Sequence, residues 1–263
     1  MNHPALSYLS ADRLAALAEG RELPASGQGA ALTADISGFT ALTELLARTR
    51  GERRGADELA SLLNIVYEVL IAQVERAGAA IISFSGDAML CWFARDNGAA
   101  ALRCAAAIQA AMAGLELPPV SGVGSVSLAV KCAIVCGQAY RLRLGDGEIQ
   151  YLDTLAGPAL LDLAAIEQLA RPGEIVVDRA IASRLPAPEI KEWRRLSDPE
   201  LEGAVVEPAG PFFEASSPQA ASRKVAASAA RRVLVMAYLE SWGEGMILGS
   251  AHDRTSVSFA SVL

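Results

Sequence analysis

Two apolar runs separated by a Ser-Gly-Asp turn constrain most strongly what this 263-residue chain can fold into. The first run is AAIISF (79–84), the second is AMLCWF (88–93), and Asp87 stands in the turn between them. Apolar runs of this length joined by a glycine-containing turn predict a β-hairpin. The turn places Asp87 at the tip of the hairpin, where its carboxylate can meet a carboxylate from another strand.

Asp35 is the carboxylate that we expect to meet it. This residue lies near the end of the apolar run AALTADI (30–36), and a Ser-Gly-Phe turn leads from that strand into a helix. Magnesium and manganese prefer carboxylate oxygens, and a pair of such ions suits in-line displacement at phosphorus. Asp35 and Asp87 are therefore predicted metal ligands. The alternative is that both residues only cap turns, a position that aspartate often takes.

The rest of the chain alternates between helical and strand patterns. Apolar residues recur at helical spacing between residues 59 and 74, and Gly78 ends that helix. The predicted order, β-α-α-β-β-α-β-β-α-β, indicates an α+β domain with helices packed on one mixed sheet. We expect a helix and a loop in residues 1–27, this domain in 28–200, and an Ala-, Ser- and Pro-rich linker in 201–250.

Composition excludes several classes of function. The net charge is −7 and the pI is near 5.0, which argues against broad binding of nucleic acid. The four cysteines form no CxxC pair, so buried, reduced thiols are expected in place of a zinc site. No signal peptide and no membrane span is apparent, and a cytoplasmic protein that does not bind a membrane is expected.

Cations occur in two places of interest. The four arginines between residues 48 and 54 alternate with acidic residues, which favours a solvated connector between two helices. Lys131, Arg141 and Arg143 alternate with apolar residues along a predicted strand. An exposed face, or a surface that forms a dimer, is the expected position of these three side chains.

The motifs ADISGFT (34–40) and FSGDAML (84–90) together resemble the class III nucleotide cyclase catalytic domain, and most closely the first catalytic domain of soluble, bicarbonate-type adenylyl cyclases and their bacterial relatives. VKCAIVCGQAYRLRLG (130–145) is similar to the central strand pair of that family, and GPALLDLAAIEQLA (157–170) to its helix after the substrate strand. The resemblance covers roughly residues 28–185. It implies a ferredoxin-like cyclase fold, with a mixed sheet and helices packed on it.

The resemblance also implies a chemistry. ATP, or else GTP, would be converted to the 3′,5′-cyclic nucleotide and pyrophosphate, with two Mg²⁺ or Mn²⁺ ions as cofactors. Asp35 and Asp87 would be the catalytic carboxylates that hold the ions, and the backbone carbonyl of Ile36 would be a further metal ligand. Substrate phosphates would lie against main-chain N–H groups at the start of a helix, those of Ser37, Gly38, Phe39 and Thr40.

The sequence departs from the family where the other half of the site is expected. Ser83 occupies the position of a base-reading lysine, and Leu161 and Ala165 occupy those of the asparagine and arginine that stabilise the transition state. Asp153 is one residue out of frame with the base-reading aspartate. A homodimer would therefore be a poor cyclase, and a complementary second cyclase domain, in cis or in trans, is the expected partner.

Bicarbonate activation is not expected either, because Ser83 and Ala164 or Ala165 replace the family's bicarbonate-binding lysine and arginine. DRTSVSFASVL (253–263) resembles the first strand of a second cyclase domain. Residues 251–263 are therefore expected to begin such a domain, in a chain that is a fragment or a shortened product of a tandem protein.

Two alternatives stay open at this point. The chain is a catalytically inactive, cyclase-like module that binds nucleotide and regulates a partner, which the missing residues favour. Alternatively it is a palm-type diguanylate cyclase or polymerase, although SGDAM lacks the acidic residue expected after Asp87 in such a hairpin.

Overall fold

Strand β1 (Ser26–Ser37) lies at the centre of the sheet and is buried along most of its length. It pairs antiparallel with β3 (Ala88–Ala94) on one side and with β4 (Ala129–Gly145) on the other. The computed structural model of the chain describes residues 6, 8–119, 126–146, 148–185, 189–197, 200–208 and 213.

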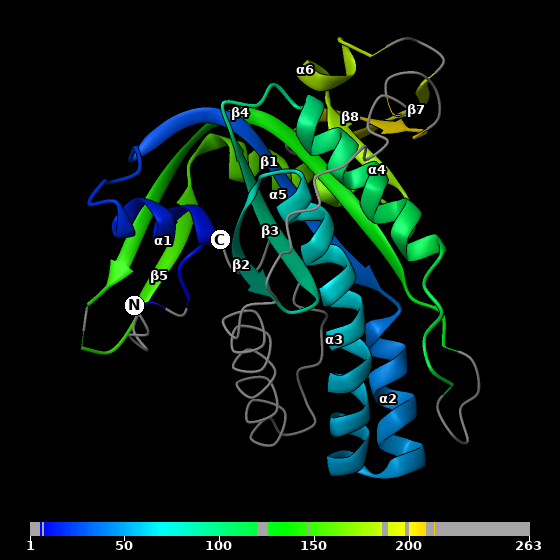
Figure 1. Ribbon diagram of the computed structural model, residues 1–263. Helices are drawn as coiled ribbons and strands as arrows, with labels where there is room; N and C mark the ends of the chain where they lie inside the picture. The colour runs from blue at the N-terminus through cyan, green and yellow to red at the C-terminus, as the bar shows by residue number, and fades with distance from the viewer. Residues whose placement is uncertain are drawn as a thin grey trace.

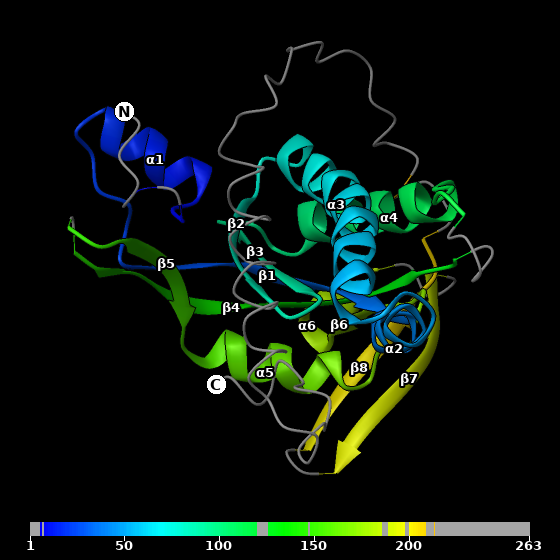
Figure 2. The ribbon, with the colours of Figure 1, turned by 90° about the horizontal axis from the view of Figure 1, so that it is seen from below.

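The remaining elements surround these three strands (Figures 1 and 2). None of the described helices combines the length and the apolar character that crossing a bilayer requires. The helices are α1 (Ala11–Ala18), α2 (Phe39–Arg50), α3 (Glu52–Arg76), α4 (Ala99–Ala113), α5 (Pro158–Glu167) and α6 (Arg179–Ala182), and the other strands are β2 (Ala80–Ser85), β5 (Tyr151–Ala156), β6 (Ile175–Asp178), β7 (Ile190–Ser197) and β8 (Glu200–Val206).

The strand order is β2-β3-β1-β4-β6-β8-β7, with β5 paired to the end of β4 that extends beyond β1. Among the strands that the structure describes, only β4 and β6 run parallel. Helices α3 and α4 cover one face of the sheet and α5 the other (Figure 2). Alternate residues of β1 supply the two cores, Leu32 to the first and Ala31 to the second. The predicted α+β architecture, a mixed sheet with helices on it, is confirmed.

The predicted hairpin is present as β2 and β3, with Ser85 paired to Ala88 and Gly86 at a φ of 62°. A glycine with positive φ at the first position of a two-residue turn matches the twist of the flanking strands. The Tyr67 hydroxyl of α3 donates a hydrogen bond to the Gly86 carbonyl at 3.2 Å. Asp87 is thus held at the hairpin tip by a buried residue of a long helix.

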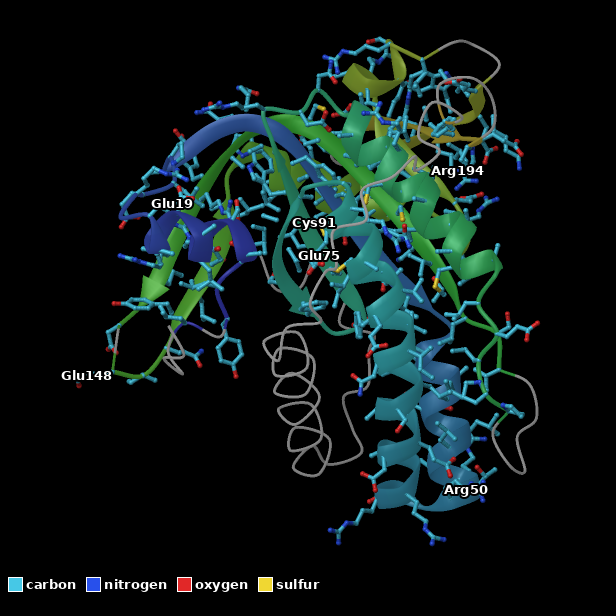
Figure 3. The ribbon with its side chains drawn as sticks, viewed as in Figure 1. Glu19, Arg50, Glu75, Cys91, Glu148 and Arg194 are labelled. Carbon is cyan, nitrogen blue, oxygen red and sulfur yellow. The ribbon has the colours of Figure 1, made fainter. Side chains whose placement is uncertain are left out.

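The connector predicted around the arginine cluster is shorter than expected. Gly51 alone separates α2 from α3, with φ 78° and ψ 160°, and the charged residues that follow form the first turns of α3. The two helices pack closely at Gly55, where an added Cβ would lie only 2.9 Å from the Leu46 backbone. Figure 3 shows Arg50 at the far end of this pair, so these cations lie away from the start of α2.

The sheet also extends past the predicted domain boundary at residue 200. Strand β8 pairs with β6 and β7, so the first six residues of the predicted linker, 201–206, belong to the sheet. Val205 belongs to the core on the α5 side of the sheet, whereas Ala204 and Val206 belong to the core on the other side. The rest of that linker, apart from residues 207, 208 and 213, and the predicted strand at 251–263 lie outside the described residues.

Helix α1 is fixed to the β4–β5 arm by a buried network of charges. Asp153 of β5 is fully buried and accepts from Arg13 Nε at 2.5 Å, from Arg141 Nη2 at 3.1 Å and from the Ser10 hydroxyl. Arg141 also pairs with Asp12 at 2.5 Å. The prediction that Arg141 is exposed is therefore wrong, because an N-terminal helix distant in sequence covers it. Arg143, on the same strand, is exposed as predicted.

This network gives a stability prediction. Asp153→Ala leaves Arg13 and Arg141 buried without their shared carboxylate, which should lower the free energy of unfolding by roughly 3–5 kcal/mol in urea denaturation. Glu19→Ala is the matched control, because it removes an ion pair with Arg21 that is 59% exposed on both sides, and should cost less than about 1 kcal/mol. A loss from Asp153→Ala as small as that of the control would contradict the role given to this network.

Candidate functional site

The structure brings the two predicted aspartates together. Asp35 stands on β1 opposite Ala88, the residue that follows Asp87 in the hairpin. The Ile36 N–H donates a hydrogen bond to the Asp87 carbonyl at 3.0 Å, which joins the hairpin tip directly to the end of β1. The distance between Asp35 and Asp87 is thus set by backbone hydrogen bonds and does not depend on side-chain packing alone.

The proximity of the two carboxylates changes the acidity of one of them. Burial and the negative charge of Asp35 raise the pKa of Asp87 to about 6, although the cation of Lys131 acts in the opposite direction. Two like charges held this close repel each other in the fold. The pair is therefore arranged to attract a cation.

Lys131 lies at the candidate site, which the sequence analysis did not predict. It stands opposite Asp35 on β4, and its Nζ lies 2.9 Å from Asp35 Oδ2 while also contacting the Glu167 carboxylate of α5. Burial alone would lower the pKa of Lys131, but the carboxylates of Glu167 and Asp35 outweigh it and raise that pKa. Its predicted position on an exposed face is wrong, because α5 covers this face of the sheet and Glu167 of that helix, 4% exposed, draws the ammonium group inward.

These four side chains define the charge of the site. Three carboxylates against one ammonium leave two negative charges, the amount that a divalent ion balances. No three His, Cys, Asp or Glu side chains gather as a complete metal centre within the described part of the chain. The hard carboxylate oxygens fit Mg²⁺ or Mn²⁺, which also take ligands from the main chain, water and phosphates.

The turn after Asp35 opens directly into helix α2. Gly38 is the N-cap of that helix, at a φ of 93°, and no side chain caps its first N–H groups. Phe39 is buried in the core while Thr40, the second helical residue, is exposed. The first turn of a helix presents N–H groups without intrahelical acceptors, so the stretch Ser37–Thr40 offers donors and a partial positive charge beside the aspartates.

Comparison with solved structures shows that the fold is similar to that of nucleotide cyclase catalytic domains. The guanylyl cyclase Cya2 superposes with a TM-score of 0.58 and 20% identity, covering 69% of this chain and 92% of that one. The adenylyl cyclase CyaB from P. aeruginosa superposes with a TM-score of 0.53 and 21% identity, covering 69% and 95%. The chain has the class III nucleotide cyclase fold.

Sequence comparison points in the same direction. Adenylate cyclase type 10 of Oryctolagus cuniculus is 27% identical over 155 residues, which are 57% of this chain and only 9% of that much longer protein. No family model matches the sequence.

The structure also shows the positions where the resemblance to cyclases predicts residues that read the base or stabilise the transition state. None of the side chains at these positions can take such a role. Leu161 is 66% exposed on α5 and Ala165 is buried. Asp153 does not replace the base-reading aspartate, because its carboxylate is fully buried in the network that holds α1. Ser83, beside an irregularity in β2, brings no positive charge.

The acidity of Asp87 predicts how pH affects the protein without metal. Its folded pKa of about 6 lies above the ordinary aspartate pKa of 3.8, so the stability that this group contributes below pH 4 should be lost as pH rises through 6. Asp87→Asn removes the carboxyl group that titrates, and with it this loss of stability. At pH 7.5 in EDTA, the variant should be more stable than the parent by about 1–2 kcal/mol in urea unfolding, and nearly equal to it at pH 4.

The exposed carboxylate Asp57, on α3, provides the control. Asp57→Asn should leave the pH profile of unfolding unchanged, because this side chain is exposed to solvent. A parent whose stability does not fall between pH 4 and 7.5, or an Asp87→Asn variant that is less stable at pH 7.5, would contradict the repulsion between Asp35 and Asp87.

Proposed function

We propose that this chain is the metal-bearing half of a nucleotide cyclase, which forms 3′,5′-cyclic AMP and pyrophosphate from ATP. GTP is the alternative substrate, because the residues that would read the base are absent from this half. The observation that carries the proposal is the convergence of Asp35 and Asp87 beside the uncapped start of α2. The cyclase fold supports it, since neighbours with this fold are named adenylyl and guanylyl cyclases.

The metal ligands in this proposal are Asp35, Asp87 and the carbonyl of Ile36. Bound Mg²⁺ or Mn²⁺ supplies positive charge that makes the ribose 3′-hydroxyl more acidic and neutralises the triphosphate and its leaving group. The raised pKa of Asp87 means that this carboxylate is charged and ready for an ion only above about pH 6. Burial of the Ile36 side chain is compatible with its role, which needs the main chain alone.

Binding of the triphosphate is assigned to two groups of donors. The N–H groups of Ser37, Gly38, Phe39 and Thr40 hold phosphate oxygens at the helix start. Lys131 adds a full positive charge next to Asp35, so a phosphate held near that carboxylate also comes within reach of the ammonium group. Catalysis then depends mainly on position and charge, with few proton transfers by the protein.

The proposal requires a complementary domain. Leu161 and Ala165 cannot stabilise the charge that develops on the transferring phosphate, and the loss of a cation at that point costs on the order of 10³–10⁵ in rate in other phosphoryl-transfer enzymes. A second cyclase domain with an asparagine and an arginine on the matching helix would supply them, in cis or in trans.

A cytoplasmic location is part of the same proposal. All four cysteines are free, and burial raises the pKa of Cys104 to about 12 and that of Cys136 to about 11. Such thiols stay protonated and unreactive, which is typical of proteins in reducing compartments.

The central test is cyclic nucleotide formation from ATP and from GTP with Mn²⁺. The full chain is assayed alone and with a separate cyclase domain that carries the asparagine and arginine. Activity should need the added domain, and Asp35→Ala or Asp87→Ala should lower it about 100-fold or more, whereas Asp57→Ala should not. No product in any combination, with metal-dependent nucleotide binding intact, would favour the inactive regulatory module instead.

A second test concerns Lys131. Lys131→Gln should weaken ATP binding in Mn²⁺ about tenfold, the equivalent of 1.4 kcal/mol, because one phosphate contact and one positive charge are lost. Lys131→Arg should recover part of the affinity. Arg143→Gln, on the same strand but exposed, is the control, and isothermal titration calorimetry is the measurement. Equal affinities for Lys131→Gln and the parent would remove Lys131 from the site.

A further inference from the structure

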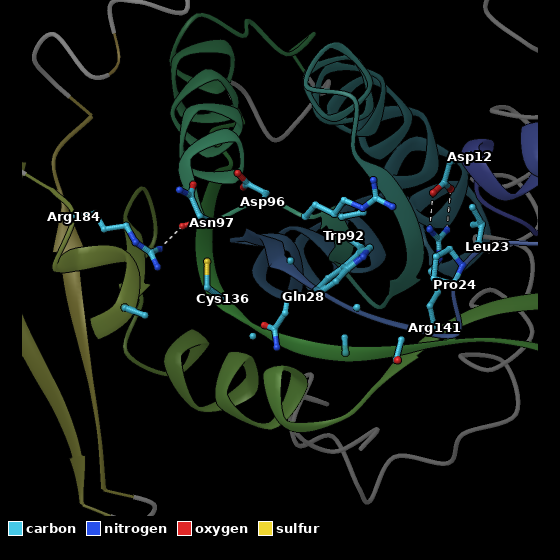
Figure 4. Close-up of a pocket in the computed structure, with 18 residues that line it drawn as sticks. Asp12, Leu23, Pro24, Gln28, Trp92, Asp96, Asn97, Cys136, Arg141 and Arg184 are labelled. Atoms are coloured by element: carbon cyan, nitrogen blue, oxygen red, sulfur yellow. Dashed lines mark hydrogen bonds and ion pairs between the residues drawn. The ribbon is translucent and has the colours of Figure 1, made fainter.

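A cavity of about 740 Å³ opens at the end of the sheet opposite the aspartates (Figure 4). The start of β1, the end of β3 with its loop to α4, the middle of β4, the end of α6 and the segment after α1 form its walls. Its volume is in the range of sites that bind small molecules. Gly29 lines it and lies six residues before Asp35, about 20 Å along an extended strand, so the cavity is separate from the candidate catalytic site.

Two arginines at this cavity have no carboxylate partner within the described residues. Arg95 follows β3 and is the one non-glycine residue with positive φ there, at 60°, fixed by a 2.9 Å bond from its N–H to the Gln28 carbonyl. Its guanidinium makes no ion pair or hydrogen bond with any residue that the structure describes. Arg184, past the end of α6, donates to the Asn97 carbonyl at 2.5 Å and forms no ion pair with a described residue, although its charge acts to lower the pKa of Asp178 and of the Cys136 thiol.

The nearby carboxylates are already satisfied by other groups. Asp96 accepts from the N–H groups of Ala100 and Ala101 at 3.1 and 3.0 Å, which caps α4. Asp178 accepts from the N–H groups of Cys136 and Ile181, both at 2.7 Å. At the other end of the cavity, Asp12 pairs with Arg141. In a chain of net charge −7, this leaves Arg95 at the cavity without a paired anion, while Arg184 has only the charge of Asp178, with which it forms no ion pair, near it.

The space between the two ends contains the aromatic side chain of Trp92 and the polar side chain of Gln28. Figure 4 shows Trp92 in the middle, between Arg184 and Asn97 on one side and Leu23 and Pro24 on the other. The indole packs against β1 only because residue 29 is a glycine. A Cβ at this position would lie 2.5 Å from the ring.

Gly27 adds to the space by having no side chain. Two residues from Gly29, it shares the strand face that meets Trp92, and a Cβ there would meet nothing within 4 Å. A larger residue at 27 would therefore enter open space and would need no unusual backbone angle.

We propose that this cavity is a second ligand site, for a small anion that joins a carboxylate or a phosphate monoester to a planar apolar body. Arg95 binds the anionic group, because guanidinium groups pair with both kinds of oxygen anion, and Arg184 adds positive charge at the same cavity. Trp92, Leu23 and Pro24 cover the apolar body. The assignment is independent of the cyclase proposal, since it uses none of the residues at the aspartates.

Binding of two probes to the full chain tests this site. Phenyl phosphate and benzoate are titrated by isothermal titration calorimetry in EDTA, against inorganic phosphate and the neutral benzyl alcohol. Saturable binding of at least one aromatic anion is expected, at least about tenfold tighter than either the anion alone or the alcohol. Binding should persist in Asp35→Ala. No saturation by about 10 mM, or loss of binding in Asp35→Ala, would overturn the proposal.

Two variants separate charge from shape. Arg95→Gln with Arg184→Gln removes both guanidinium groups, and Gly27→Leu fills the cavity while leaving them in place. Each should weaken binding about tenfold or more, with circular dichroism and melting temperature close to those of the parent. Arg53→Gln with Arg54→Gln, two exposed arginines at the start of α3, removes the same charge elsewhere and should have no effect. Unchanged binding in both cavity variants would exclude this site.

Discussion

The pairing of β1 with its two neighbours is the constraint on which the rest of the structure depends. β3 and β4 bond to β1 from Gly29 to Asp35 and from Ser26 to Ser37, respectively. Because side chains alternate along a strand, this register decides which residues reach each of the two cores and which reach the site. The aspartate pair lies at one end of the strand and the arginine-lined cavity at the other. Both therefore rest on one rigid element.

Electrostatics at the aspartate end are balanced only in part. Lys131 offsets the charge of Asp35, and Glu167 holds Lys131 from the opposite side, yet the repulsion on Asp87 persists. Repulsion between Asp35 and Asp87 destabilises the fold when no metal ion is bound, and a bound cation would relieve that repulsion. The same chain neutralises Asp153 almost completely, with two arginines and a hydroxyl, where no ligand is needed.

Sequence reasoning succeeded where the signal was local. The hairpin, its glycine turn and the convergence of Asp35 with Asp87 follow from short motifs whose chemistry acts over a few residues. The predicted exposure of Lys131 and Arg141 was wrong because their partners, Glu167 and Asp12, are distant in sequence. The alternation of charged and apolar residues along a strand predicts that such cations are exposed unless a distant acidic partner is known. Strands β7 and β8 were missed for a related reason: β7 is mostly polar and half-exposed, and its order comes from pairing with β8.

The register of β1 also limits how this protein can vary in length. A single residue inserted or deleted between Ser26 and Asp35 would turn every later side chain of the strand to the opposite face, exchanging the members of the two cores. The carboxylate of Asp35 would then point away from Lys131. The outer edge of the sheet, where β7 and β8 meet through an irregular register, is under no such restriction. Insertions that add new properties to this fold are thus best tolerated at that edge and in the connections, while β1 keeps its length.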